Sequence, residues 1–217
     1  MKFKNTLVKT ILATVIVTVI IAVTSCKKED TADPSGLIVQ AHNENEMMKI
    51  MHKMSHSMDT MTNMNNVDHD FAMMMKMHHQ GALDMANYEL VHGDNPAMKT
   101  KANQIISAQT AEIAELNTFL KNHMDMDHAY SAEYNMVVMA SMKKMTKGAD
   151  LQVVTGDSDN DFAALMIVHH QSATEMAHAQ IKFGKDAGLK TMAQKMIDDQ
   201  NMEIDEFQNW LLINKPY

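Results

Sequence analysis

Two pairs of adjacent histidines are the residues of this sequence whose types and spacing best suit chemistry. The pairs lie 91 residues apart, and each is followed later in the chain by a Gln-x-x-Glu motif. The residues concerned are His78, His79, Gln109 and Glu112 in the first copy, and His169, His170, Gln200 and Glu203 in the second. Imidazole with carboxylate suits zinc or copper(II), whereas imidazole with thioether favours copper(I). The pattern therefore predicts a metal-binding protein, with a copper ion as the first candidate.

Methionine supplies the thioethers. The chain holds 25 methionines beside 12 histidines, and some of them flank the histidine pairs at helical spacing. The candidate ligands are Met75, His78, His79, Met85 and Glu112, then Met166, His169, His170, Met176 and Glu203, and upstream Met48, Met51, His52 and His56. Methionine also fills irregular cores and adaptable partner-binding faces, so many of these sulfur atoms have a purely structural alternative.

An internal repeat explains why the motif occurs twice. A shift of 91 residues aligns 70–120 with 161–211 without a gap, and 20 of the 51 positions are identical. Almost the whole stretch has helical spacing, so each copy predicts a leading helix followed by a helical hairpin. We expect an all-α fold in which the two hairpins form a four-helix core and the leading helices pack against it.

Hairpin geometry brings the polar residues to one height. His78 lies 15 residues before Gly93, and Gln109 lies 16 residues after it. In an antiparallel pair of helices these positions face each other, with Glu112 one turn further along. We therefore expect His78 and its counterpart His169 to be buried beside the inward-facing Gln and Glu residues.

A hydrogen-bond network is the structural alternative to a metal site. A buried carboxylate needs a partner, and histidine and glutamine can provide one. The doubling of the motif favours metal. The sequence nevertheless has only two inward carboxylates and lacks Glu-x-x-His, so it does not contain the full ligand set of a ferritin-type di-iron centre.

The helix boundaries follow from turn residues. Helices are predicted near 39–62, 69–92, 96–122, 130–146, 160–183 and 187–213. Asn95 and Asp186 are typical N-caps. Gly93 and Gly184 are expected to end their helices in the left-handed conformation. Asp68 and Asp159 are expected to cap the helices that carry the histidine pairs.

The first 26 residues predict a lipoprotein signal peptide. Lysines precede an apolar stretch, 11–23, which ends in small residues and the single cysteine, Cys26. The alternative is a membrane-spanning helix, but 13 residues rise only about 20 Å against a hydrocarbon core of about 30 Å. We expect lipidation at Cys26 and a protein anchored to the cell envelope after export, with the outer membrane or cell surface as one destination.

The remaining chain divides into two parts. Residues 27–37 are a polar tether, and 38–217 form the duplicated domain, with units 44–120 and 135–211. The chain carries a net charge of −8, and all its basic residues are lysine. Both facts argue against a nucleic-acid partner, because such surfaces are basic and rich in arginine.

The motifs also resemble a known family. Met-x-x-His-His-x-x-Ala-x-x-Met-Ala followed by Gln-x-x-Glu-Ile, present twice over roughly 68–213, is similar to the bacterial domain of unknown function 305. The position before His-His, often proline in that family, is Met77 or Val168 here. The resemblance implies a ferritin-like helical bundle, and for some members copper binding and tolerance outside the cytoplasm.

Three functions are compatible with these observations. The first is a non-enzymatic protein that binds and sequesters copper, for homeostasis or tolerance. The second is a metal-dependent redox protein, although the sequence has no activated nucleophile or cofactor motif. The third is a structural or partner-binding lipoprotein, whose protein partner the sequence does not name and whose His/Gln/Glu core is only a network.

Overall fold

The computed structural model describes residues 39–123 and 131–214, and these residues form six helices without a strand. The predicted signal peptide, Cys26 and the polar tether lie outside the described residues. The helices are α1 (Glu46–Asp59), α2 (Val67–His92), α3 (Pro96–Asn122), α4 (Ala132–Asp150), α5 (Ser158–Phe183) and α6 (Ala187–Ile213).

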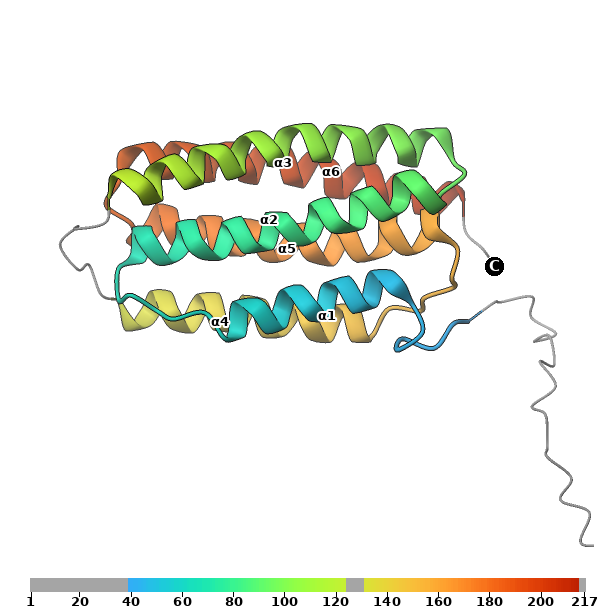
Figure 1. Cartoon of the computed structure of the whole chain (residues 1–217), viewed down its shortest axis with the longest axis horizontal. Coiled ribbons are helices and arrows are strands. Elements are labelled where there is room, and N and C mark those ends of the chain that lie inside the picture. Colours follow the sequence, from blue (N-terminus) through green and yellow to red (C-terminus); the bar gives the residue numbers. More distant parts are fainter. Residues whose placement is uncertain (1–38, 124–130, 215–217) are drawn as a thin grey trace, which may run out of the picture. The chain divides into compact units, whose positions relative to one another are not determined.

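The helices of this domain lie in three layers of two (Figure 1). The middle layer is α2 and α5, which contact each other; α3 packs on α2, and α6 packs on α5. The leading helices α1 and α4 lie on the opposite side of the middle layer and also contact each other. The predicted fold class is therefore confirmed: two duplicated hairpins form a four-helix core, and a leading helix from each unit covers it.

Two aspartates join the hairpins instead of capping their own helices. The N-caps of α2 and α5 are Asn66 and Asp157, so the prediction that Asp68 and Asp159 cap them is wrong. Each carboxylate lies two residues later, in the first turn of the helix, and accepts hydrogen bonds from two backbone N–H groups in the turn of the other hairpin. Asp68 accepts from residues 185 and 186, and Asp159 accepts from residues 94 and 95, at 3.0–3.2 Å.

The turn glycines are required by close approach and not by backbone conformation. Gly93 and Gly184 have φ values of −68° and −66°, so the predicted left-handed stop is wrong. A Cβ on Gly184 would lie 2.3 Å from Gln180 Nε2 and 2.6 Å from Asp68 Oδ1, and one on Gly93 would lie 2.0 Å from Glu89 Oε1. The polar side chains of Gln180, Asp68 and Glu89 therefore occupy the space that a Cβ at these glycines would need. The N-cap predictions for Asn95 and Asp186 are confirmed.

The leading helices differ most from their predicted bounds. α1 begins only after Asn45, whose side chain accepts a hydrogen bond from the N–H of Met48, and α4 continues to Asp150.

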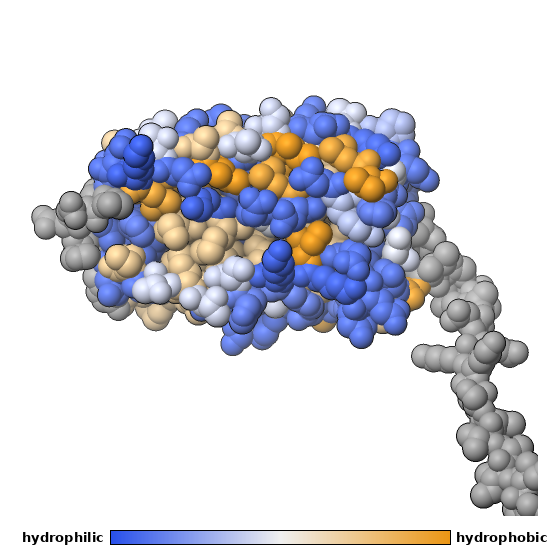
Figure 2. All heavy atoms as spheres, viewed as in Figure 1, coloured by the Kyte–Doolittle hydropathy of each residue, from blue (hydrophilic) through white to orange (hydrophobic). Residues whose placement is uncertain are grey.

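Hydrophilic side chains cover much of the face drawn in Figure 2, and weakly apolar side chains gather near its centre. None of the helices among the described residues combines the length and apolar character needed to cross a bilayer.

Candidate functional site

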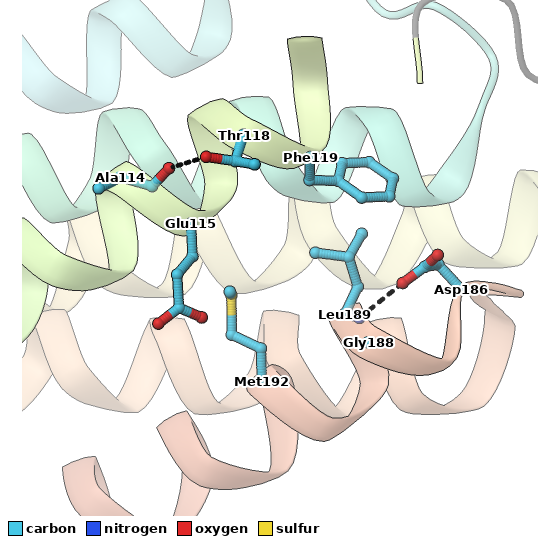
Figure 3. A pocket seen from close by; sticks show the side chains of 8 residues that line it. All are labelled: Ala114, Glu115, Thr118, Phe119, Asp186, Gly188, Leu189 and Met192. Atoms are coloured by element: carbon cyan, nitrogen blue, oxygen red, sulfur yellow. Dashed lines mark hydrogen bonds between the residues drawn. The ribbon is translucent and has the colours of Figure 1, made fainter. Parts of the chain in front are cut away.

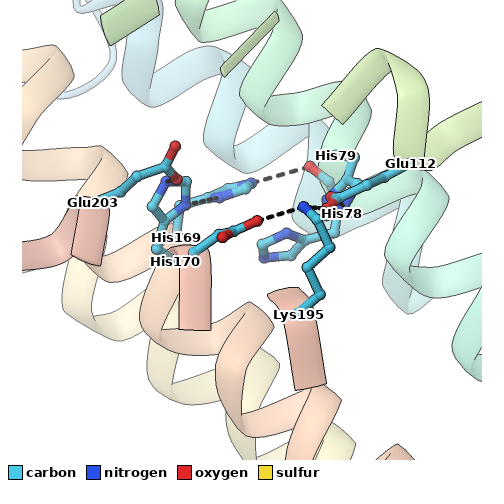
Figure 4. A network of polar contacts seen from close by, with 8 residues as sticks. His78, His79, Glu112, His169, His170, Lys195 and Glu203 are labelled. Atoms are coloured by element: carbon cyan, nitrogen blue, oxygen red, sulfur yellow. Dashed lines mark hydrogen bonds and ion pairs between the residues drawn. The ribbon is translucent and has the colours of Figure 1, made fainter. Parts of the chain in front are cut away.

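Four histidines meet in the middle layer, where α2 and α5 cross (Figure 4). His78, His79, His169 and His170 are each 0% exposed. The rings of His78 and His169 pack against each other at an interplanar angle of 37°, with their centroids 3.7 Å apart. Because α2 and α5 carry the same motif, the two pairs meet about the pseudo-twofold axis of the repeat, as the spacing predicted.

The carboxylates reach the second histidine of each pair. His79 Nε2 lies 2.7 Å from Glu112 Oε2, and His170 Nε2 lies 2.8 Å from Glu203 Oε2. We expected the glutamates beside His78 and His169, which instead pack against each other across the axis. Successive residues of a helix point about 100° apart, so the second histidine turns toward the outer helix that carries the glutamate.

Burial keeps the central histidines neutral. Desolvation, and then the neighbouring imidazoles, lower the pKa of His78 and of His169 well below 6.5. A neutral imidazole keeps one nitrogen lone pair free for a metal. Histidines held in this form are ready to bind a metal without first losing a proton.

Hydrogen bonding locates the lone pair of His169 in the second copy. His169 Nε2 lies 3.0 Å from the backbone oxygen of His78 and must donate, because a carbonyl only accepts. The lone pair of His169 is therefore on Nδ1, which lies 3.4 Å from His170 Nδ1 in a buried hydrogen bond. His170 Nε2 lies 2.8 Å from Glu203 Oε2 but is not aligned to form a hydrogen bond with it. The two Nδ1 atoms form a close pair that a cation can bridge in place of the hydrogen bond between them.

The first copy has more unsatisfied nitrogen atoms. Within the described part of the chain, neither ring nitrogen of His78 has a hydrogen-bond partner, and neither has His79 Nδ1. The side-chain oxygens of Gln109 and Gln200 are likewise buried and unpartnered. Buried polar atoms normally find partners, so the unpartnered ring nitrogens of His78 and His79 fit a site that holds an ion.

The donor set fits copper or zinc, but the side chains would have to adjust. Across residues 39–123 and 131–214, no three His, Cys, Asp or Glu side chains are placed to hold a metal ion together as they stand. The ring of His78 has no hydrogen bond to break, so its reorientation would lose only packing contacts. Met75 precedes it by three residues, so its thioether lies about one turn away on the same helix.

The other sequence-predicted ligands are divided between core and surface. Met75, Met85, Met166 and Met176 are at most 1% exposed on the histidine helices. Upstream, Met48 and Met51 are buried in the core, whereas His52 and His56 are exposed. His52 pairs with Asp150 of α4 at 2.8 Å. The sulfur atoms of this upstream set are therefore in the core, and its imidazoles are in solvent.

Sequence reasoning missed a lysine that distinguishes the two halves of the site. Lys195 of α6 has its Nζ 3.9 Å from Glu112 Oε1 and 2.5 Å from Asp199 Oδ2 (Figure 4). The equivalent residue of the first unit, 91 positions earlier, is Gln104. Only the repeat alignment could have indicated this difference, because a lone surface lysine carries no motif.

A groove between α3 and α6 reaches the same glutamate. Two adjoining hollows of about 390 and 470 Å³ share Glu115, Gly188 and Met192. The first extends to Phe119 and Leu189 (Figure 3), and the second extends to Glu112 and Lys195. Glu112 therefore contacts the buried His79 on one side and lines an open groove on the other.

Comparisons with known proteins identify one family and several solved structures to which this chain is similar. The family model described as Domain of unknown function (DUF305) matches residues 68–211. CopM in the Cu(I)-bound form shares 26% identity at a TM-score of 0.52, covering 67% of this chain and 95% of that chain. CopM in the Ag-bound form shares 26% at 0.53, covering 68% and 96%.

A third solved structure supports the fold alone. A DUF305 protein from Streptomyces coelicolor shares 21% identity at a TM-score of 0.54, covering 69% of this chain and 94% of that chain. No curated protein matches this chain in sequence.

Proposed function

This chain belongs to the DUF305 family, and from that premise we propose that it binds copper outside the cytoplasm, with the central histidine cluster as its binding site. The role we propose is copper sequestration for homeostasis or tolerance, without catalysis. The family resemblance inferred from the twin histidine motif is confirmed by the family model.

The observation that carries the proposal is the close approach of two buried ring nitrogens, His169 Nδ1 and His170 Nδ1. Their separation of 3.4 Å is close to that of two nitrogen ligands which each lie about 2.0 Å from a shared metal ion. Both residues are fully buried, and the hydrogen bond from His169 Nε2 to the His78 carbonyl orients the first ring. This is the arrangement by which second-shell partners normally orient metal-binding histidines.

The metal we propose is copper(I), with copper(II) or zinc as weaker alternatives. Structures titled CopM in Cu(I)-bound and Ag-bound forms, both soft monovalent ions, support this choice at 26% identity. Neutral imidazoles with nearby thioethers also favour copper(I). Carboxylates at Glu112 and Glu203 would make the same centre tolerant of divalent ions.

Export and lipid anchoring complete the proposal. The apolar stretch before Cys26 supports secretion with a lipid on the cysteine, which would hold the domain at the membrane by a short tether. A copper-binding domain in this place would intercept metal before it enters the cell. Metal ions and the membrane are the partners we propose.

Anaerobic copper(I) titration of the full chain in mild detergent, against a chromogenic competitor, tests the binding site. We expect His169→Gln with His170→Gln to lose at least one tightly bound copper(I), because both converging nitrogens are removed. His52→Gln with His56→Gln is the matched control, since these imidazoles are exposed. The control should keep every tightly bound ion.

The competing reading is a hydrogen-bond network, and the 2.7 Å contact between His79 and Glu112 favours it. In that case the His169/His170 variant would lose stability while it remained folded and kept its full copper stoichiometry. Circular dichroism on the same samples separates this outcome from simple unfolding.

A further inference from the structure

The groove between α3 and α6 is asymmetric in a way that the repeat reveals. The two helices run antiparallel across the pseudo-twofold axis, so each half of their seam should resemble the other. In one half, Lys101 of α3 forms an ion pair with Glu206 of α6 across the seam. In the other half, the equivalent residues are Met192 of α6 and Glu115 of α3.

Replacement of the lysine by methionine leaves the second half open. Glu115 and Met192 point toward each other across the hollow in Figure 3, and both line it where its two parts join. A thioether cannot form an ion pair with the carboxylate. This position of the second half therefore has no ion pair, and the half is spanned only further along, by the 3.9 Å contact between Lys195 Nζ and Glu112 Oε1, whereas Lys101 and Glu206 pair directly across the first half.

The open half leads to the buried histidines. Glu112 lines the inner part of the groove, and its Oε2 lies 2.7 Å from His79 Nε2. The Glu112 side chain is 11% exposed, whereas His79 is fully buried. Groove, glutamate and histidine thus form a continuous sequence of metal-binding groups from solvent to core.

We propose that this groove is the entry route by which a soft monovalent cation reaches the histidine cluster. The inference rests on the proposed function, and it names Met192 as the first selective contact. Glu115 and Glu112 attract cations of any kind, but a thioether binds copper(I) or silver(I) well and binds magnesium or calcium poorly. Lys195, 3.9 Å from Glu112 Oε1, offsets the charge of that glutamate and repels a divalent ion about twice as strongly as a monovalent one, because the Coulomb energy is proportional to the charge.

Met192→Lys tests the route, because it copies the residue that closes the other half. The readout is stopped-flow loading of the full chain in detergent from a copper(I) complex with a coloured chelator, followed by the final stoichiometry. We expect loading to slow by about tenfold, as a cation placed on the route repels the incoming ion. The final number of bound ions should not change, since no histidine is altered.

Three further variants make the result specific. Met202→Lys adds the same charge at an exposed methionine of α6 and should load at the normal rate. Met192→Leu removes only the sulfur and should slow copper(I) loading without adding charge. Lys101→Met opens the other half and should speed loading.

The route and the proposed function fail in different ways. If Met192→Lys and Met202→Lys both load as fast as the unaltered chain, the groove is not the route, although the histidines would remain the site. If both lysine variants slow loading equally, the effect is general surface charge and the route is overturned. The proposed function is refuted by a different result: full copper binding in the His169→Gln/His170→Gln variant.

Discussion

Glu89→Gln is a substitution for which the repeat provides an internal reference. Glu89 of α2 is 0% exposed, accepts a hydrogen bond from Ser158 Oγ at 2.7 Å, and shares a hydrogen bond with Asp159. Its equivalent in α5 is Gln180, whose Nε2 donates to Asp68 Oδ1 at 2.6 Å. An ionised carboxylate cannot donate, so Glu89 must keep a proton to do for Asp159 what Gln180 does for Asp68.

Holding that proton costs stability at neutral pH. Burial, and then the hydrogen bond to Asp159, raise the pKa of Glu89 from 4.5 to about 8. The folded chain therefore keeps a proton that the unfolded chain releases above pH 4.5. The contribution of Glu89 to stability is greatest below pH 4.5, and it declines as the pH rises to about 8.

The size of the effect follows from the linkage relation. Each unit of pH in this window costs about 1.4 kcal/mol, which sets a ceiling of about 3 kcal/mol at pH 7. Glutamine offers the same donor without a proton to lose. We expect Glu89→Gln to increase the free energy of unfolding by about 1–3 kcal/mol at pH 7 and to change it little at pH 4.5.

Urea unfolding between pH 4.5 and pH 9 measures this difference directly. Gln180→Glu is the converse variant, and it should lose stability with rising pH across the same window. The reasoning is refuted if Glu89→Gln is no more stable than the unaltered chain at pH 7, or if the two stability profiles run parallel from pH 4.5 to pH 8.

Three other predictions address the turn, the methionines and the anchor. Gly184→Ala places a Cβ 2.3 Å from Gln180 Nε2 and should cost more than about 1 kcal/mol in thermal or urea unfolding. Gly148→Ala, with its nearest contact at 3.4 Å inside α4, should stabilise by about 0.5–1 kcal/mol, and the opposite order would contradict this account. Met48→Leu with Met51→Leu should keep the helicity and change stability by less than about 1.5 kcal/mol. It should leave the copper(I) stoichiometry unchanged in competition titration, because both thioethers lie in the core, where the exposed His52 and His56 do not join them; a lost copper ion would make them ligands. Cys26→Ala should release the protein from the membrane fraction after cell fractionation, and continued tight association would mean that residues 11–23 are a retained span.

The repeat made the architecture predictable. Because 70–120 and 161–211 align without a gap, one hairpin implied the other and their apolar faces implied a shared core. The histidines were correctly placed in that core, since they recur at helical spacing among apolar residues. Burial of the two histidine pairs therefore follows from pattern alone.

The sequence pattern did not predict the rotation of each helix about its axis or the contacts that each unit makes with the other. His78 and His79 point about 100° apart around the same helix. The sequence distance from the hairpin turn gives the height of Glu112 along that helix, but not which of the two histidines faces it. Asp68 was predicted to be an N-cap because its position fits one locally. Its hydrogen-bond partners, at 185 and 186, lie in the other unit and cannot be inferred from the local sequence. The turn at Gly184 needed glycine for the same reason, because the atoms that would clash belong to a contact between units.

The central claim is that imidazole nitrogen, and not methionine sulfur alone, holds copper(I) in this protein. X-ray absorption at the copper edge of the full chain, loaded anaerobically with one copper(I), tests it most directly. The account predicts at least two nitrogen scatterers at about 2.0 Å with the outer-shell pattern of imidazole, absent in the His169→Gln/His170→Gln variant. A first shell made only of sulfur at about 2.3 Å, unchanged in that variant, would contradict it.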